Sequence, residues 1–179
     1  MDDVNKLKDQ LKKNNVEVIF KNASATEENI RSEVISELKT RGDIRVKVLL
    51  HSLAFGALKP VFDETLKSSL NQRQIEMTLN VMASSLIYWS QDLFYSELLK
   101  DGSQIFAMTS SGSHRQWKAY GAVSAAKAAL ESYCRQLATE LGPSRIACNA
   151  LQAGVTDTPA LRKIPGNDLM IENTLKINP

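Results

Sequence analysis

Short apolar runs rich in β-branched residues alternate along this chain with longer segments of helical periodicity. Short apolar runs of this kind predict buried parallel strands, and their alternation with helices is typical of an α/β fold. With 179 residues, 43% of them apolar, and no internal repeat or linker, the chain fits one domain spanning residues 1–179. The predicted strands are 16–20, 46–50, 104–108 and 145–151, and the predicted helices are 3–14, 27–39, 72–99 and 119–141.

The last of these helices carries the pair of residues that points most directly to chemistry. Tyr120 and Lys127 are seven residues apart, close to two helical turns, so they lie on one stripe about 10 Å apart along the axis. A lysine ammonium beside a tyrosine hydroxyl favours the ionised phenolate and so suits the tyrosine to general acid chemistry. The spacing alone fits equally well an aromatic residue at a helix start and a lysine lying over alanines.

Charge and targeting signals narrow the range of functions. The net charge of +2, from 22 basic and 20 acidic residues, gives no electrostatic reason to expect nucleic acid binding. The first residues lack the apolar core of a secretory signal, and no apolar run is long enough for a membrane span, which predicts a cytoplasmic protein without membrane contact.

Cys134 and Cys148 lack companions at metal-ligand spacing, so we expect buried thiols and no metal site. His51 is expected to be a hydrogen-bonding residue at a strand end.

Glycine spacing sets a limit on nucleotide binding. A doubly wound nucleotide-binding fold needs a glycine-rich turn before its first helix, where the pyrophosphate approaches the backbone. The eight glycines of this chain never come closer together than nine residues, which excludes G-x-G-x-x-G.

Several segments, in order, resemble the short-chain dehydrogenase/reductase family, and within it the enoyl-acyl-carrier-protein reductase branch. The Tyr-x6-Lys spacing of Tyr120 and Lys127 is similar to that branch, whereas ordinary family members have Tyr-x-x-x-Lys. The other matching segments are 48–56 (VLLHSLAFG), Asn80 in 78–81 (TLNV), 109–113 (TSSGS) after a strand, and 153–158 (AGVTDT), in which Ala153 replaces the usual proline. The resemblance runs over nearly the whole chain.

The resemblance implies a Rossmann-like doubly wound parallel sheet that is incomplete, without the glycine-rich strand-turn-helix at its N-terminal end and without the last strand. In the family's sheet order, the two strands that this chain lacks would lie between the predicted strands 16–20 and 46–50. The matched segments begin in the helix before the family's third strand and stop after the substrate-loop helix. A fragment of a longer chain is therefore one expectation.

The resemblance also implies roles for particular residues. Tyr120 would act on the substrate oxygen, Lys127 would bind the nicotinamide ribose, and Ser110 would orient the substrate. The expected catalytic residues are Tyr120, Lys127, Ser110 and Asn80. The residues expected to bind the cofactor are Lys127, His51, Ser52, Gly154, Val155 and Thr158. The residues expected to contact the substrate are Ser110, Tyr120, Leu161 and Ile164, and the last two belong to an apolar lid.

The implied activity is reduction of trans-2-enoyl thioesters, carried by acyl carrier protein or coenzyme A, with NADPH or NADH, as in fatty acid synthesis. The implied assembly is a homotetramer formed through the helices 72–99 and 119–141. Two alternatives stay open: another short-chain dehydrogenase acting on a C=O or CH–OH group, and a truncated, noncatalytic family member.

Overall fold

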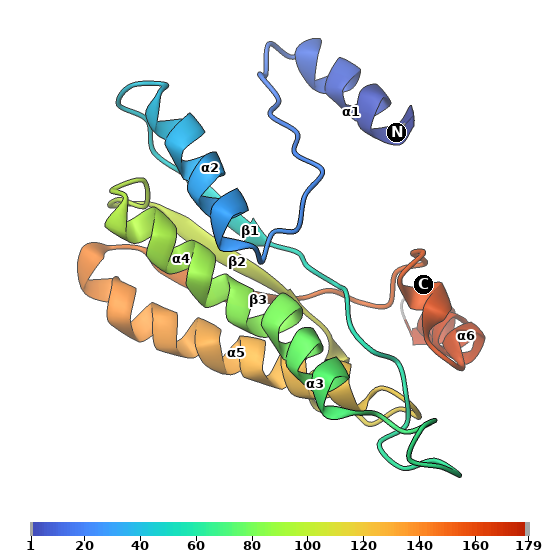
Figure 1. Cartoon of the computed structure of the whole chain (residues 1–179). Helices are drawn as coiled ribbons and strands as arrows, with labels where there is room; N and C mark the ends of the chain where they lie inside the picture. The colour runs from blue at the N-terminus through green and yellow to red at the C-terminus, as the bar shows by residue number, and fades with distance from the viewer. Residues whose placement is uncertain (1, 178–179) are drawn as a thin grey trace.

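The computed structural model describes residues 2–177, which form a small parallel sheet with helices packed on one face (Figure 1). The sheet contains β1 (Val48–His51), β2 (Gln104–Thr109) and β3 (Ala147–Gln152). The α-helices are α1 (Asp2–Lys12), α2 (Glu28–Lys39), α3 (Gln72–Leu79), α4 (Ser85–Tyr95), α5 (Gly121–Leu141) and α6 (Asn167–Ile177). Shorter helical turns are η1 (Asn80–Ser84, a π-helix), η2 (Ser111–Ser113), η3 (Gly142–Ser144) and η4 (Leu161–Lys163).

The strand order is β1-β2-β3, and both pairs are parallel. The α/β architecture with a parallel sheet is therefore confirmed, and three of the predicted strands form within two residues of their expected starts. Since parallel strands end at the same edge of a sheet, the residues after His51, Thr109 and Gln152 come together there.

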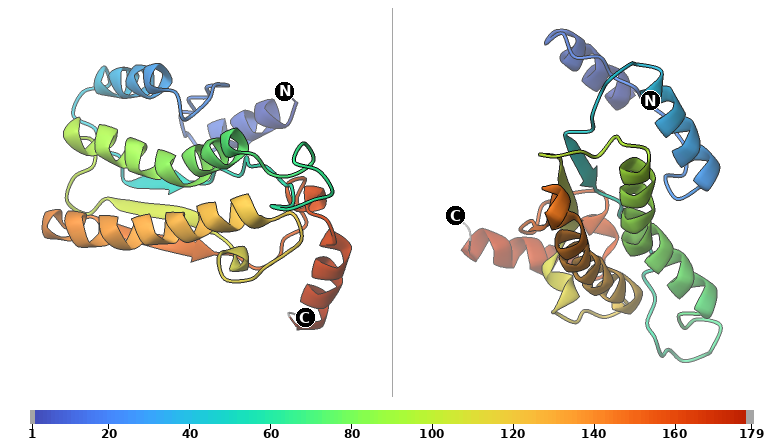
Figure 2. Two further views of the ribbon diagram at one scale, coloured as in Figure 1. Left: turned by 60° about the horizontal axis from the view of Figure 1, so that its bottom comes forward. Right: turned by 90° about the vertical axis from the view of Figure 1, so that its left-hand side faces the viewer.

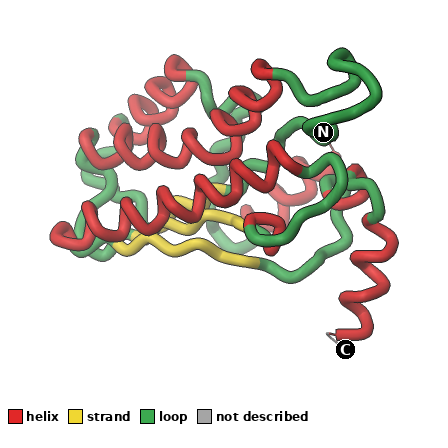
Figure 3. The backbone as a smooth tube through the Cα atoms, turned by 90° about the horizontal axis from the view of Figure 1, so that it is seen from below, coloured by secondary structure: helices red, strands yellow, loops and turns green. Residues whose placement is uncertain are grey.

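The core lies between the sheet and the helices α3, α4 and α5, which cover the same face (Figures 2 and 3). Alternate residues of β2 point into it: Ile105 and Ala107 are fully buried. The stripe of α5 that faces them includes Val123, Ala126 and Leu130, which recur at helical spacing. The opposite face of the sheet keeps Val48 and Leu50 half exposed.

The predicted strand at 16–20 is wrong. The segment after α1 is extended but pairs with no strand among the described residues, and Val16, Ile19 and Phe20 remain 42–47% exposed. The physical reason is that an apolar run becomes a strand only when neighbouring strands accept its backbone hydrogen bonds. In the expected sheet order two further strands lie between this segment and β1, and no strand among residues 2–177 takes their place.

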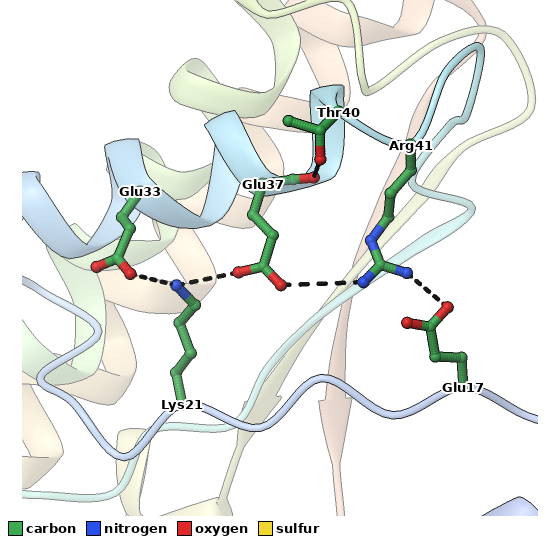
Figure 4. Close-up of polar contacts among 6 residues, drawn as sticks. All are labelled: Glu17, Lys21, Glu33, Glu37, Thr40 and Arg41. Atoms are coloured by element: carbon green, nitrogen blue, oxygen red, sulfur yellow. Dashed lines mark hydrogen bonds and ion pairs between the residues drawn. The ribbon is translucent and has the colours of Figure 1, made fainter.

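Ion pairs tie this extended segment to α2 instead (Figure 4). Lys21 Nζ lies 2.6 Å from Glu33 and 3.1 Å from Glu37, and Arg41 contacts Glu17 at 2.6 Å. Such exposed pairs contribute little each, so this segment is held more weakly than the core.

The helix predicted over 72–99 is interrupted. It begins as α3, widens into the π-turn η1 at Asn80, continues as α4 and ends at Tyr95. The hydroxyls of Thr78, Ser85 and Ser90 each donate to the carbonyl four residues earlier, a local bond that competes with regular helix geometry. After β3, the chain forms the short turn η4 and then α6. Among residues 2–177, no helix has both the length and the apolar character that a membrane span requires.

Candidate functional site

Tyr120 stands at the start of α5, in a tightly built turn. The preceding residue, Ala119, has φ of 63°, a left-handed conformation that is uncommon for a residue with a side chain. The Tyr120 carbonyl already accepts the first helical hydrogen bond, from Ser124 N at 2.8 Å. The Tyr120 side chain is 8% exposed. The strained turn thus fixes where the tyrosine ring enters the fold.

Lys127 lies two turns further along the same buried stripe and is 7% exposed. Its Nζ donates a hydrogen bond to the Met108 carbonyl in β2, at 2.6 Å. Burial lowers the pKa of Lys127, and the nearby Glu131 carboxylate opposes that change. The amine is thereby held at the carboxyl end of β2, with two further N–H groups that find no acceptor within residues 2–177.

Ser110 follows β2 directly and shares a close contact with Tyr120 through Gly112. A Cβ added to Gly112 would lie 2.4 Å from Tyr120 Cε1 and 3.3 Å from Ser110 Oγ. The glycine therefore lets the loop approach the tyrosine ring closely, with the serine hydroxyl on the same side. Ser110 Oγ is buried and has no hydrogen-bond partner among the described residues. Ser110 and the Tyr120 ring thus lie beside the same glycine, and Lys127 Nζ is bonded two residues before Ser110. Their expected catalytic roles stay predictions.

Glu131 holds this loop in place, a role that the sequence analysis missed. Thr109 Oγ1 donates to Glu131 Oε1 at 2.6 Å, and His114 Nε2 lies 3.6 Å from Glu131 Oε2. Burial alone would raise the pKa of Glu131, but hydrogen bonding, chiefly from Thr109, and the charges of His114 and Arg135 together outweigh it, so the pKa is lowered. The signal in the sequence was the spacing: Glu131 lies one turn after Lys127, on the same side of the helix.

His51 ends β1 and is 4% exposed. Its Nε2 lies 2.7 Å from Ser85 Oγ, and that hydroxyl donates its own hydrogen to the Val81 carbonyl. Nε2 must therefore be the donor, which leaves Nδ1 as a bare acceptor, buried without a partner in the described part of the chain. Burial, and then the positive charge of Lys127, lower the pKa of His51 to about 4. His51 is a strand-end hydrogen-bonding residue within reach of the Lys127 charge.

Asn80 lies in the π-turn η1, which packs against α5. Single π-turns within helices are frequent at functional sites. The Asn80 side chain accepts a hydrogen bond from the Tyr88 hydroxyl at 3.2 Å, and Arg31 lies over the Tyr88 ring at 5.1 Å. Its expected part in catalysis stays a prediction.

The remaining predicted site residues lie on segments that follow strands. Ser52 is exposed directly after β1, and Gly154 and Val155 follow β3 in the same way. Thr158 Oγ1 accepts a hydrogen bond from the backbone N–H of Leu161, the first residue of η4, at 3.1 Å. Ile164 packs against the core, and Leu161 is half-buried. Their roles toward cofactor and substrate stay predictions, because none of these contacts joins them to Tyr120 or Lys127.

The arrangement offers hydrogen-bonding groups to a polar ligand. The unpartnered Ser110 Oγ and the free N–H groups of Lys127 can bind polar ligand groups at the carboxyl edge of the sheet. The glycine spacing of the whole sequence provides no turn for a pyrophosphate.

Comparison with known proteins gives a consistent result. A family model described as enoyl-(acyl carrier protein) reductase matches residues 1–179. The curated enoyl-acyl-carrier-protein reductase (NADH) FabI of Rickettsia felis is 28% identical over 171 residues, covering 88% of this chain and 64% of that protein. The enzyme of the same name from Aquifex aeolicus is 30% identical over 132 residues, 74% of this chain and 48% of its own length.

Solved structures extend the likeness to the fold. The crystal structure of the Aquifex aeolicus enoyl-acyl-carrier-protein reductase (NADH) superimposes with a TM-score of 0.81 and 22% identity, over 97% of this chain and 65% of that one. The Bacillus cereus enoyl-acyl carrier protein reductase was solved with NADP+ and an indole naphthyridinone. It superimposes with a TM-score of 0.75 and 22% identity, over 86% of this chain and 58% of that one. The chain thus spans between about half and two thirds of the length of these relatives.

Proposed function

Because this chain belongs to the enoyl-(acyl carrier protein) reductase family, we propose that it reduces trans-2-enoyl thioesters, carried by acyl carrier protein or coenzyme A, with NADH or NADPH. One observation supports the proposal. The Tyr120 ring and Ser110 Oγ lie beside Gly112, and Lys127 Nζ binds the Met108 carbonyl near the end of β2, while the Ser110 hydroxyl and two N–H groups of Lys127 have no partner among residues 2–177.

In this proposal Tyr120 donates a hydrogen bond to the thioester oxygen, where negative charge develops during reduction. A donor already fixed in a buried site stabilises that charge without having to reorganise. The Ala119 turn and the close contact at Gly112 hold the tyrosine, and Ser110 orients the same oxygen. A bound reduced nicotinamide would supply the hydride.

Lys127 has two tasks in the proposed mechanism. The N–H groups that Met108 leaves free would bind the ribose hydroxyls of the nucleotide, and the positive charge would favour proton donation by Tyr120. His51, Ser52, Gly154, Val155 and Thr158 would complete the nucleotide site, Asn80 would support the helix behind it, and Leu161 and Ile164 would cover the acyl chain.

The first experiment is a fluorescence titration of the purified chain, with its intact mass confirmed, against NADH and NADPH separately. Saturable binding supports the proposal and selects the nucleotide. Absence of binding at millimolar nucleotide overturns it for this polypeptide and favours the noncatalytic alternative, which the missing glycine-rich turn also favours.

The second experiment measures turnover of an enoyl thioester by the wild type and by Tyr120→Phe. We expect a loss of about 100-fold or more in kcat, the usual contribution of a positioned proton donor. Tyr95→Phe is the matched control, because Tyr95 is 80% exposed and should leave kcat unchanged. Turnover of ketoacyl but not enoyl thioesters would favour the alternative of a dehydrogenase acting on C=O.

The proposal includes a cytoplasmic location and a homotetramer formed through the α3–α4 and α5 helices. Light scattering of the purified chain tests the assembly. A monomer at all concentrations would contradict the tetramer and leave the turnover experiment to decide the chemistry.

A further inference from the structure

Cys134 and Cys148 are separated by fourteen positions in the sequence but lie at one place in the fold. Cys134 is on α5 and Cys148 is the second residue of β3, and these two elements pack against each other. Both residues are buried, with 4% and 8% of their surface exposed. They also line the same cavity of about 340 Å³, together with Thr109, Glu131, Arg135 and Asn149 among others. The two cysteine residues therefore border one cavity.

The two thiols are not equivalent. A hydrogen bond from the Cys148 thiol lowers the pKa of Cys134, and the Arg135 charge acts in the same direction while burial and Glu131 oppose it. The same contact, with burial, raises the pKa of Cys148. Cys134 is thus the thiol that more readily becomes a thiolate, which is the nucleophilic form.

We propose that Cys134 and Cys148 form a redox pair in which a hydroperoxide oxidises Cys134 and Cys148 then closes a disulfide between α5 and β3. The inference does not depend on the reductase activity, because it uses thiols, a cavity and a contact that lie outside the proposed catalytic residues.

The chemistry balances in two steps. The Cys134 thiolate attacks one peroxide oxygen, the O–O bond breaks, and the products are a sulfenic acid on Cys134 and, after uptake of a proton, one water or alcohol. The Cys148 sulfur, losing its proton, then attacks the Cys134 sulfur and releases the sulfenic oxygen as water. Two thiols lose two electrons, and the hydroperoxide gains them.

The disulfide would form beside the loop that carries Ser110. Glu131 precedes Cys134 by three residues on the same helix and binds Thr109, the residue before Ser110. Oxidation of the two cysteines would therefore change the same cavity wall from which Glu131 binds the Ser110 loop.

The test treats the reduced, folded chain with hydrogen peroxide and measures intact mass and non-reduced peptides. The expected product has lost two hydrogen atoms and contains a Cys134–Cys148 cross-linked peptide within one chain. Cys148→Ser should instead form a sulfenic acid at Cys134 that dimedone traps, at a rate within about twofold of wild type. Cys134→Ser should consume peroxide at least about tenfold more slowly, since the remaining thiol is mainly protonated.

Circular dichroism of each variant checks that it is folded, and unfolding in urea supplies the reference in which both thiols are free. Three results would overturn the proposal: no oxidation of the folded wild type under conditions that oxidise the unfolded chain, equal reactivity of the two single variants, or a disulfide that joins two chains.

Discussion

At the scale of single residues, Gly112 has the clearest steric role. Its missing side chain leaves room for the Tyr120 ring, which a Cβ would approach to 2.4 Å. We predict that Gly112→Ala lowers the free energy of unfolding by about 1–3 kcal/mol, the usual cost of overpacking, because either the ring or the loop must move. Urea unfolding measures this loss.

Gly154→Ala is the matched control for that substitution. A Cβ at Gly154 would meet no atom within 4 Å, and its backbone does not adopt a left-handed φ. Equal unfolding midpoints for the two alanine variants would show that the loop at Gly112 can move to admit a Cβ without loss of stability. That result would contradict the tight contact.

His51 makes a prediction about acid stability. Burial and the Lys127 charge lower its pKa from 6.5 to about 4 in the folded chain. In the unfolded chain the histidine takes up its proton below pH 6.5, whereas the folded chain resists protonation until about pH 4. Stability is therefore full above pH 6.5 and declines as the pH falls towards 4, by roughly 3 kcal/mol from this group.

The measurement is the pH dependence of urea unfolding in wild type and in His51→Gln, which cannot titrate but can still donate to Ser85. The Gln variant should lose less stability between pH 6.5 and 4. His114→Gln, at a side chain that is 68% exposed, should retain the wild-type slope. A His51→Gln slope identical to that of wild type would contradict the burial of a neutral imidazole.

At the scale of elements, the loop between β2 and α5 depends on one carboxylate from α5. Glu131 binds Thr109 at the strand end and interacts with His114 across the loop. Glu131→Ala should leave α5 intact but increase hydrogen exchange of the amides at 110–114 by about tenfold or more, because a net hydrogen bond to a charged group contributes about 1.5–3 kcal/mol.

Glu140→Ala, on the exposed part of the same helix, provides the comparison for that experiment. If both variants exchange alike, the loop is held by its own turn η2 and not by Glu131.

The same elements show how far sequence reasoning reaches. The buried stripe of α5 was predictable, because apolar residues at helical spacing are buried together on one side of a helix. The same spacing puts Tyr120 and Lys127 on one stripe, and the apolar run 104–108 puts Ser110 after a strand. Their catalytic roles stay predictions. The outcome at 16–20 was not predictable, because a strand depends on partners distant in sequence. The π-turn at Asn80 and the meeting of Cys134 with Cys148 depend likewise on how elements pack, which spacing along the chain does not encode.

At the scale of the whole molecule, the helices of residues 2–177 cover only one face of the sheet. In β1, Leu49 is half-buried and His51 is buried on the side of the helices, whereas Val48 and Leu50 on the other side are 50% and 54% exposed. Parallel sheets are normally covered on both faces. The chain also corresponds to only 65% of the Aquifex aeolicus structure that it superimposes on. An apolar sheet face next to an unpaired strand edge favours association with other chains.

We therefore predict that Leu50→Lys reduces both the binding of a hydrophobic dye and the rise of light scattering with concentration, because a charge on an exposed edge strand opposes strand pairing. Leu66→Lys is the control, since Leu66 is 89% exposed but lies in the loop between β1 and α3, away from the sheet. The free energy of unfolding of Leu50→Lys should stay near the wild-type value, because the side chain that it replaces is already half exposed. If Leu66→Lys suppresses association and Leu50→Lys does not, then the chains associate through the loop and not through the exposed face of the sheet.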